Sequence, residues 1–348
     1  MTNPTTPPRK SVFVTGANGY IGFAVCRAFV RAGWRVYGLV RRAESAGALV
    51  AEEITPILGS ISKSATFVAD LHAHTKTVDV VVSCTEQIPF AEHCEALVVL
   101  FKQIAETSNA HGVKPLVLMS SGCKDYGTTG LHGAPGLAPH TEESPLRPLD
   151  VVRDRTYGCL GLLTHGDAFD AAVLRATPVF GYEGSYYGHA FEVAAAADRT
   201  LELPLDFGTV LHGCHIDDCA EAYLALAEHP DRAAVAGQCF NVSAARYDTL
   251  GTVAKALEAE YGLAGGVVQT SPTDGDAMLP FLDVVLGYSQ WVDSTKIRQL
   301  TGWSDKRALL SENMHVYRMA YEEAAKRGHE GVLRVKERIG GALAAVKM

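Results

Sequence analysis

The sequence has 348 residues, of which 47% are hydrophobic and 20% charged, as expected for a globular chain of about two domains. The formal net charge of −8 argues against a nucleic-acid-binding surface, which needs a basic patch. No apolar run approaches the roughly eighteen residues that a membrane span requires. Residues 1–10 are polar and rich in proline and lack the apolar core of a signal peptide, so we expect a disordered lead there.

The cysteines and histidines show neither a disulfide framework nor a metal motif. The 8 cysteines are spread along the chain without a CxxC pair, which predicts reduced, mostly buried thiols in a cytoplasmic protein. The pairs His72/His74 and His212/His215 have no companion ligands at zinc-like spacing. We therefore predict no metal site.

In chain order, the first predicted unit is a strand, a glycine turn, a helix and a second strand. Val12–Val14 form a short apolar run that suits a buried strand. Gly16, Gly19 and Gly22 follow at the spacing GxxGxxG, apolar residues then repeat with helical period, and WRVYGLV predicts the second strand. In such a unit the glycines let the backbone approach a pyrophosphate, and the helix N-terminus presents N–H groups to it.

The residues after the second strand bear on the choice between NAD and NADP. An acidic side chain at this point accepts hydrogen bonds from the ribose hydroxyls of NAD. This chain instead has Arg41 and Arg42, whose charge and forked donors suit the 2′-phosphate of NADP. The alternative is that both arginines belong to an ordinary surface turn. We predict NADP (NADPH) as the cofactor.

The GxxGxxG spacing resembles that of the extended short-chain dehydrogenase/reductase family, of the NAD(P)-dependent epimerase/dehydratase type. Later segments are similar to further motifs of this family, in order: FVADL (67–71, a third-strand end), DVVVSCTE (79–86, the fourth strand), LVLMSSGCKDYG (116–127, the fifth strand with an SSxxxYG segment), AAVLRATPVFG (171–181, the sixth strand), HIDDCAEAYLAL (215–226, a helix start) and YSQWVDSTKIRQLTGW (288–303). SSGCKDYG and RATPVFGYEGSYYG also look like segments of epimerase-like proteins of fungal specialised metabolism.

The resemblance implies an α/β fold, a Rossmann-like doubly wound parallel sheet with a smaller C-terminal substrate-binding lobe. The alternation of strand and helix patterns predicts the same sheet. We expect an NADP-binding Rossmann domain over 11–181 and a substrate lobe over 182–330, interleaved with returning Rossmann elements at about 209–245. A C-terminal helix is expected over 331–348, with its apolar face packed on the body or on a second subunit.

The resemblance also implies which residues contact the cofactor besides the two arginines. Asp70 is expected to contact the adenine, and Arg155 to replace the cation that holds the nicotinamide ribose. The full expected set is Gly16, Asn18, Gly19, Tyr20, Ile21, Gly22, Arg41, Arg42, Asp70, Leu71, Ser83, Cys84, Thr85, Arg155 and Pro178.

The catalytic residues of the family are matched only in part. In the family, a serine near the fifth strand and a tyrosine bond the reacting carbonyl, and a lysine one helical turn later lowers the pKa of the tyrosine. Aligning SSGCKDYG by its YG end puts Gly122 at the serine position, with Ser121 just before it. Tyr157 is the candidate tyrosine, but Gly161 stands where the lysine belongs.

A second alignment register counts back from the sixth strand. This register puts the lysine position near Arg153 or Arg155 and the tyrosine position at Leu149 or Val151. In this register the chain therefore has no tyrosine at the catalytic position. Replacement chemistry is expected from residues in unusual positions, although each has an alternative role as a solvated loop residue. The catalytic candidates are therefore Tyr157, Lys124, Ser121 and Glu86.

Functions from three classes fit these observations. The first is an NADP-dependent oxidoreductase acting on a carbonyl or enone of a small compound, with specialised metabolism suggested by the resemblance. The second is a non-redox isomerase, dehydratase, cyclase or lyase that keeps NADP as a structural group, and the third is a cofactor-sensing regulator. The retained cofactor motif favours the first. We expect a small-molecule substrate, no nucleic-acid or membrane partner, and leave a homodimer open.

Overall fold

The computed structural model describes residues 9–271 and 283–346. The chain forms two compact units that alternate along the sequence. The first contains the residues up to Ser121, Asp150–Arg175 and Ala220–Phe240, and the second contains Gly122–Leu149, Ala176–Cys219 and the residues from Asn241 onward. Segment 122–149 lies inside the predicted 11–181 domain but packs with the second unit. The binding roles expected of the two parts stay predictions.

The centre of the first unit is a seven-stranded sheet with the order β11-β6-β5-β4-β1-β2-β3. Its strands are β1 (Ser11–Thr15), β2 (Arg35–Val40), β3 (Thr55–Leu58), β4 (Val80–Ser83), β5 (Leu116–Gly122), β6 (Asp170–Ala176) and β11 (Cys239–Val242). β1 pairs in parallel with both β2 and β4, so the chain runs outward to β3 and then returns to the other side of β1. Strand order therefore reverses between β1 and β4, which is where ligands bind in doubly wound sheets.

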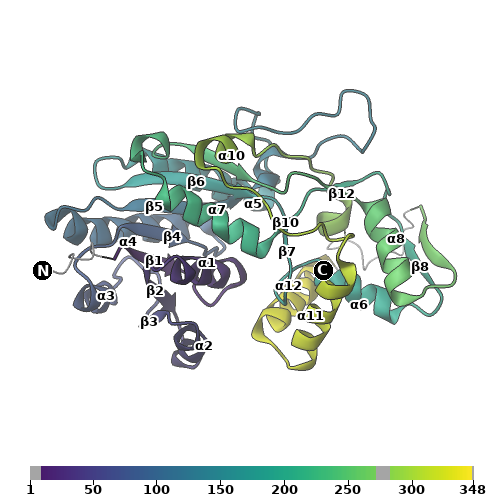
Figure 1. The fold of residues 1–348 in the computed structure, drawn as a ribbon, viewed down its shortest axis with the longest axis horizontal. Coiled ribbons are helices and arrows are strands. Elements are labelled where there is room, and N and C mark those ends of the chain that lie inside the picture. The colour runs from purple at the N-terminus through teal and green to yellow at the C-terminus, as the bar shows by residue number, and fades with distance from the viewer. Residues whose placement is uncertain (1–8, 272–282, 347–348) are drawn as a thin grey trace, which may run out of the picture. The chain divides into compact units, whose positions relative to one another are not determined.

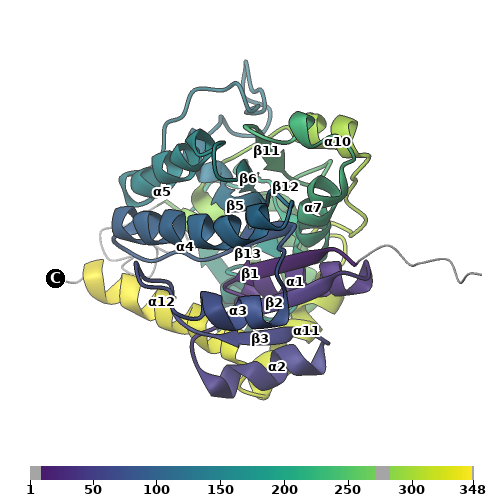
Figure 2. The same ribbon diagram turned by 90° about the vertical axis from the view of Figure 1, so that its left-hand side faces the viewer.

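Helices cover both faces of this sheet, as predicted. Figure 2 shows α4 (Phe90–Ala110) and α5 (Asp150–Gly161) on one face, with α1 (Tyr20–Arg31) and α7 (Ile216–Glu228) on the other. Alternate strand residues such as Phe13, Val81 and Val117 pack in one core with the apolar stripe of α4. That stripe has the helical spacing of Leu97, Leu100, Phe101 and Ile104.

The expectation that FVADL (67–71) ends the third strand is wrong. The third strand is β3, and residues 68–74 form α3 (Val68–His74). The buried residues of this stretch, Phe67, Val68 and Leu71, follow the helical spacing i, i+1, i+4 rather than the alternation of a strand. The other predicted strands and helices, from β1 to α7, lie where the sequence indicated. Between β2 and β3, the chain also forms η1 (Ala43–Ser45) and α2 (Ala46–Ala51), and Figure 1 shows α2 near β3.

The second unit has its own apolar core and three small two-stranded sheets. These pair β7 (Val179–Phe180) with β10 (Cys214–His215), β9 (Val210–Leu211) with β12 (Asp248–Thr249), and β8 (Thr200–Leu203) with β13 (Gly266–Gln269). Figure 1 shows α6 (Gly188–Ala196), α8 (Leu250–Tyr261), α11 (Met314–Lys326) and α12 (Glu330–Val346) gathered together. Shorter elements are η2 (Cys123–Tyr126), η5 (Asp283–Gly287) and α10 (Thr295–Thr301).

The predicted C-terminal helix is present as α12. Val332, Val335 and Ile339 are buried along one of its faces, and Val332 belongs to the core of the second unit. The further face residues that the sequence indicated, Leu343 and Val346, have side chains outside the described ones, as do residues 1–8 of the expected lead. Among the described residues, no helix combines the length and the apolar character that crossing a bilayer demands.

Candidate functional site

The glycine turn after β1 is as tight as the sequence predicted. Gly16 has φ +69°, and a Cβ on it would stand 2.8 Å from the carbonyl oxygen of Cys84. A Cβ on Gly22 would stand only 2.2 Å from the Gly16 carbonyl oxygen, and one on Gly19 would stand 3.0 Å from it. The Gly19 N–H donates to that same oxygen at 2.8 Å. Side chains would therefore fill the turn, and glycine keeps its backbone open to a ligand.

The first turn of α1 brings no negative charge to the helix N-terminus. Gly19 is the N-cap and forms no side-chain capping bond, and the first turn contains no acidic residue. Asn18, Tyr20 and Ile21 are half-buried around this turn, and Gly22 is buried. A helix start carries partial positive charge and N–H donors, so the turn fits the pyrophosphate of a dinucleotide.

The ends of β2 and β3 lie side by side, since the Gly59 N–H donates to the Val40 carbonyl oxygen at 2.9 Å. Arg41 and Arg42 follow Val40 directly, and both side chains are exposed. Beyond β3, the exposed polar residue is Ser60. The ends of β2 and β3 lie at the edge of the sheet where the adenosine of a dinucleotide binds in folds of this type.

The two residues expected from the third-strand end lie elsewhere. Asp70 is exposed in the first turn of α3, and Leu71 is fully buried in the core of the first unit. The end of the third strand is instead followed by Gly59 and the exposed Ser60. The misplacement of Asp70 and Leu71 came from the segment FVADL. Its residues match a strand-end motif of the family, but in this chain they form the start of a helix.

Hydroxyl groups line the end of β4, beside the glycine turn. The Thr15 hydroxyl donates to Ser83 Oγ at 3.1 Å and lies 3.4 Å from Thr85 Oγ1. Thr85 Oγ1 also lies 3.0 Å from Nε2 of His93, a buried histidine of α4 whose pKa is lowered by burial. His93 was not singled out from the sequence, because it stands within a regular helical pattern.

Cys84 is a protonated thiol within this group. Burial raises its pKa to about 12, and its Sγ accepts a hydrogen bond from the Ser120 hydroxyl at 3.3 Å. Ser120 also lies 2.7 Å from the Tyr223 hydroxyl, which α7 contributes and which the sequence did not indicate. Ser121, the predicted catalytic serine, is the next residue of β5 and is half-buried.

Arg155 is anchored toward the end of β4. Its Nη1 lies 3.5 Å from Oε1 of Glu86, and only 15% of its side chain is exposed. Glu86, one of the catalytic candidates, therefore has Arg155 as its described partner. Lys124 belongs to the second unit, where its Nζ lies 3.7 Å from the centre of the Tyr288 ring.

Tyr157 points away from this pair. It follows Arg155 by two residues, which is roughly 200° around a helix, and it is 51% exposed. Its neighbour Gly158 packs closely on α4, because a Cβ there would stand 3.1 Å from the Phe90 ring. Four residues before Arg155, where the second register puts the tyrosine, Val151 is 71% exposed. The burial of Arg155 favours that second register.

Most of the remaining singled-out residues have structural partners. The His212 ring lies 2.8 Å from the Ala244 carbonyl oxygen and accepts the Val292 N–H at 3.1 Å, and His72 lies 3.1 Å from the Thr75 carbonyl oxygen. The Pro178 carbonyl accepts the Cys214 N–H at 3.1 Å within the second unit. All 8 cysteines are free thiols.

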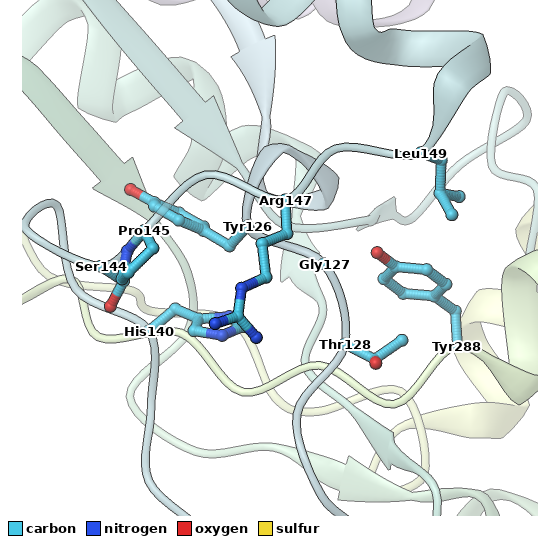
Figure 3. Close-up of a pocket in the computed structure, with 9 residues that line it drawn as sticks. All are labelled: Tyr126, Gly127, Thr128, His140, Ser144, Pro145, Arg147, Leu149 and Tyr288. Carbon is cyan, nitrogen blue, oxygen red and sulfur yellow. The ribbon is translucent and has the colours of Figure 1, made fainter.

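The second unit contains a cavity of about 440 Å³. Figure 3 shows the residues that line it, which are Tyr126, Gly127, Thr128, His140, Ser144, Pro145, Arg147, Leu149 and Tyr288. Eight of the nine come from the segment after β5, and Tyr288 comes from more than a hundred residues further along the chain. Loop residues that meet only in the folded chain carry no periodic signal, so the sequence did not indicate this cavity.

Comparison with known proteins gives the family and the fold. The model of the "NAD dependent epimerase/dehydratase family" matches residues 12–243. A search of curated proteins returned no match. Similar solved structures include UDP-glucose 4-epimerase from Thermotoga maritima with UDP-glucose (18% identity, 90% of this chain and 99% of that chain covered, TM-score 0.67) and dTDP-glucose 4,6-dehydratase from Bacillus anthracis with NAD (14%, 91%, 98%, 0.69). UDP-glucose 4-epimerase from Bifidobacterium longum with NAD+ and UDP is also similar (16%, 92%, 100%, 0.66).

These structural matches, with TM-scores of 0.66 to 0.69, establish the fold as a Rossmann-like sheet. The family match covers the glycine turn, the ends of β1 to β6 and α5, the regions in which the cofactor residues were predicted. The chain therefore belongs to the NAD-dependent epimerase/dehydratase family.

Proposed function

We propose that the chain is an NADP-dependent oxidoreductase that reduces or oxidises a carbonyl or enone of a small, specialised-metabolism compound. The observation that carries the proposal is the glycine turn at Gly16, whose space a single Cβ would fill, beside two exposed arginines after β2. A turn kept this open at the start of an uncapped helix is matched to a dinucleotide.

The proposed preference for NADP over NAD rests on Arg41 and Arg42. Two of the three solved structures named above carry NAD, the dehydratase and the Bifidobacterium epimerase. In this chain no acidic residue follows β2 directly, and the first carboxylate after the two arginines is Glu44. A guanidinium cannot accept the hydrogen bonds of ribose hydroxyls, but it donates in pairs to a phosphate.

The bound cofactor would supply or accept the hydride, and the chain's own residues would bind the cofactor and the substrate and orient them. Arg155, fixed by Glu86, would donate to the ribose hydroxyls in place of the family lysine. Ser121 at the end of β5 would hydrogen-bond the substrate oxygen. With Val151 in the tyrosine position, the proton would come from water. Under the first register, Tyr157 is the acid, and Lys124 and Glu86 remain candidates for orienting roles.

A second candidate function is favoured by one observation. Gly122 stands at the family's serine position, and neither alignment register keeps the family's tyrosine and lysine together. That change suits an isomerase, dehydratase, cyclase or lyase that keeps NADP for structure. The solved neighbours named above include epimerases and a dehydratase.

The first experiment measures cofactor binding by calorimetry, with NADPH, NADP+, NADH and NAD+ on the purified full chain. We expect NADPH and NADP+ to bind more tightly. Replacing both arginines, Arg41→Gln with Arg42→Gln, should weaken NADPH about tenfold to a hundredfold, the value of a charge-assisted hydrogen bond. Equal affinity for NADH and NADPH in the unaltered chain would refute the NADP assignment.

The second experiment separates the two candidate functions. The protein is incubated with NADPH and a panel of aromatic and polyketide-like ketones and enones, and absorbance is followed at the reduced-nicotinamide band together with product mass. Loss of absorbance matched to a product two mass units heavier supports the oxidoreductase. A product of unchanged mass with NADPH intact supports the non-redox enzyme instead.

A further inference from the structure

The cavity of the second unit carries its own charge pattern. Among the described lining residues, Arg147 and His140 alone have titratable cationic groups, and none has a carboxylate. Burial and the neighbouring Arg147 lower the pKa of His140, so the ring is neutral near pH 7. The described residues give the Arg147 guanidinium no ion pair, and its side chain is exposed. The lining thus holds one positive charge without a counter-ion.

The backbone that bears this charge is fixed. The Arg147 N–H donates to the Asp125 carbonyl oxygen at 2.9 Å, and Gly127, with φ +86°, packs against the Arg147 carbonyl. His140 is held by backbone hydrogen bonds to Trp291 and Asp293, and its ring lies 5.3 Å from the buried ring of Tyr126. In Figure 3 the Arg147 guanidinium lies beside the His140 ring. The backbone that carries the Arg147 side chain is therefore fixed by the fold, so binding does not have to order it.

A second donor faces the same cavity. The Tyr288 hydroxyl oxygen is buried and has no hydrogen-bond partner among the described residues. Burial, with the nearby Asp125, raises the pKa of Tyr288 to about 12, so the group stays a protonated donor. Figure 3 shows Tyr288 and Arg147 on opposite sides of Gly127, with the hydroxyl end of Tyr288 turned toward the Arg147 side. A buried donor without an acceptor lowers the stability of the fold. A ligand oxygen that accepted its hydrogen bond would remove this cost.

The walls suit a flat ligand body. Pro145, Leu149 and the rings of Tyr126 and Tyr288 form the apolar part of the lining. The Lys124 ammonium is not part of the lining and lies 3.7 Å from the centre of the Tyr288 ring. The volume of about 440 Å³ falls within the range of small-molecule sites. One guanidinium with one hydroxyl donor matches the two oxygens and single charge of a carboxylate, whereas a dianionic phosphate asks for more cations.

We propose that this cavity binds the carboxylate of a small planar organic acid, with Arg147 as its counter-ion and the Tyr288 hydroxyl as a second donor. The proposal goes beyond the cofactor site, because every residue in it belongs to the second unit. It assigns an acidic, ring-containing class of ligand to a chain whose glycine turn predicts only the coenzyme.

The test is calorimetry on the full chain without nicotinamide cofactor, so that its result is independent of the oxidoreductase proposal. Three compounds of one shape are compared: 2-naphthoate, 2-naphthamide and 2-naphthyl phosphate. We expect the naphthoate to bind at least about tenfold more tightly than the amide, the value of one charge-assisted hydrogen bond. Absence of heat with naphthoate, equal affinity for acid and amide, or tighter binding of the phosphate overturns the proposal.

Variants identify the residues involved. Arg147→Met should abolish the preference for acid over amide, and Arg147→Lys should keep part of it. Arg199→Met is the matched control, because Arg199 is another exposed arginine of the second unit and lies outside the cavity lining. Tyr288→Phe should weaken naphthoate several-fold without changing the affinity for the amide. Melting curves show whether each variant is folded, and a folded Arg147→Met that keeps full naphthoate affinity contradicts the assignment.

Discussion

The guanidinium of Arg155 lies 3.5 Å from the carboxylate of Glu86, which ties α5 to the segment that follows β4. Under the proposed function, the pair would hold Arg155 where a ribose-holding cation is needed. The pair is partly exposed, with 42% of the Glu86 side chain in solvent, and the ion pair alone contributes at most about 1 kcal/mol. Its importance is therefore the position that it gives to Arg155.

Replacing Arg155 should impair cofactor use more than stability. We expect Arg155→Met to raise the Kd for NADPH about tenfold or more, because a charge-assisted hydrogen bond is lost, and Arg155→Lys to restore most of it. Glu86→Gln should change affinity less than about fivefold, as for an exposed pair. Fluorescence titration with NADPH measures all three. If Arg155→Met binds NADPH normally and only melts earlier, the residue has a structural role alone.

Tyr157 should prove dispensable. Its ring is half-exposed and points away from the Arg155 side of α5, so the second register predicts that Tyr157→Phe keeps turnover within about twofold. The measurement is kcat and KM with the first substrate identified in the carbonyl panel. A tenfold or larger fall in kcat, with a shifted pH profile, would restore the first register and make Tyr157 the acid.

The glycine turn gives a stability prediction with an internal control. Gly22→Ala sets a Cβ 2.2 Å from the Gly16 carbonyl, and such overpacking costs about 1–3 kcal/mol. We expect a lower Tm and lost NADPH binding. Gly161→Ala, also in a helix but with no atom within 4 Å of the added Cβ, should leave Tm unchanged or higher. Equal melting of the two variants would show that the turn is looser than described.

Acid should destabilise the second unit through His212. Burial lowers its pKa to about 4, from 6.5 in the unfolded chain. Between these values the unfolded state binds the extra proton, so stability is complete above pH 6.5 and is lost as pH falls toward 4, by an amount on the order of 3 kcal/mol. His215, whose pKa burial also lowers, acts in the same direction.

Thermal melts between pH 7.5 and 4.5 measure this loss. His212→Gln should lower Tm at pH 7.5, because hydrogen bonds to Ala244 and Val292 are changed, yet flatten the decline of Tm with acid. His111→Gln, at an exposed position, is the control and should keep the slope of the unaltered chain. A slope that His212→Gln leaves intact would assign the acid sensitivity to other groups.

The parts of the fold that local rules govern were predictable. The turn at Gly16, Gly19 and Gly22 could be predicted from the sequence. A Cβ at each of these positions would lie within 3.0 Å of a backbone atom, so only glycine fits. The strand and helix order followed from hydrophobic period. FVADL failed because five residues are too few to separate a strand end from a helix start, and the helical spacing of its buried residues prevailed.

The site residues were predictable only where backbone shape decides them. Arg155 was one of two candidates for its position, and choosing between them required knowing that it packs toward Glu86. Arg147, His140 and Tyr288 come together through loops, in which no period relates sequence distance to spatial distance. A single sequence therefore indicates the coenzyme more clearly than the ligand.

The alternation of the two units along the chain has a consequence for biosynthesis. The first unit receives its last segment when Phe240 has been made, whereas more than a hundred residues of the second are still to follow. During translation, segments 122–149 and 176–219 are therefore made before the residues from Asn241 onward, against which they pack in the second unit. Chains stopped near residue 243 should consequently need chaperones, and supplying the missing C-terminal fragment in trans should rescue them.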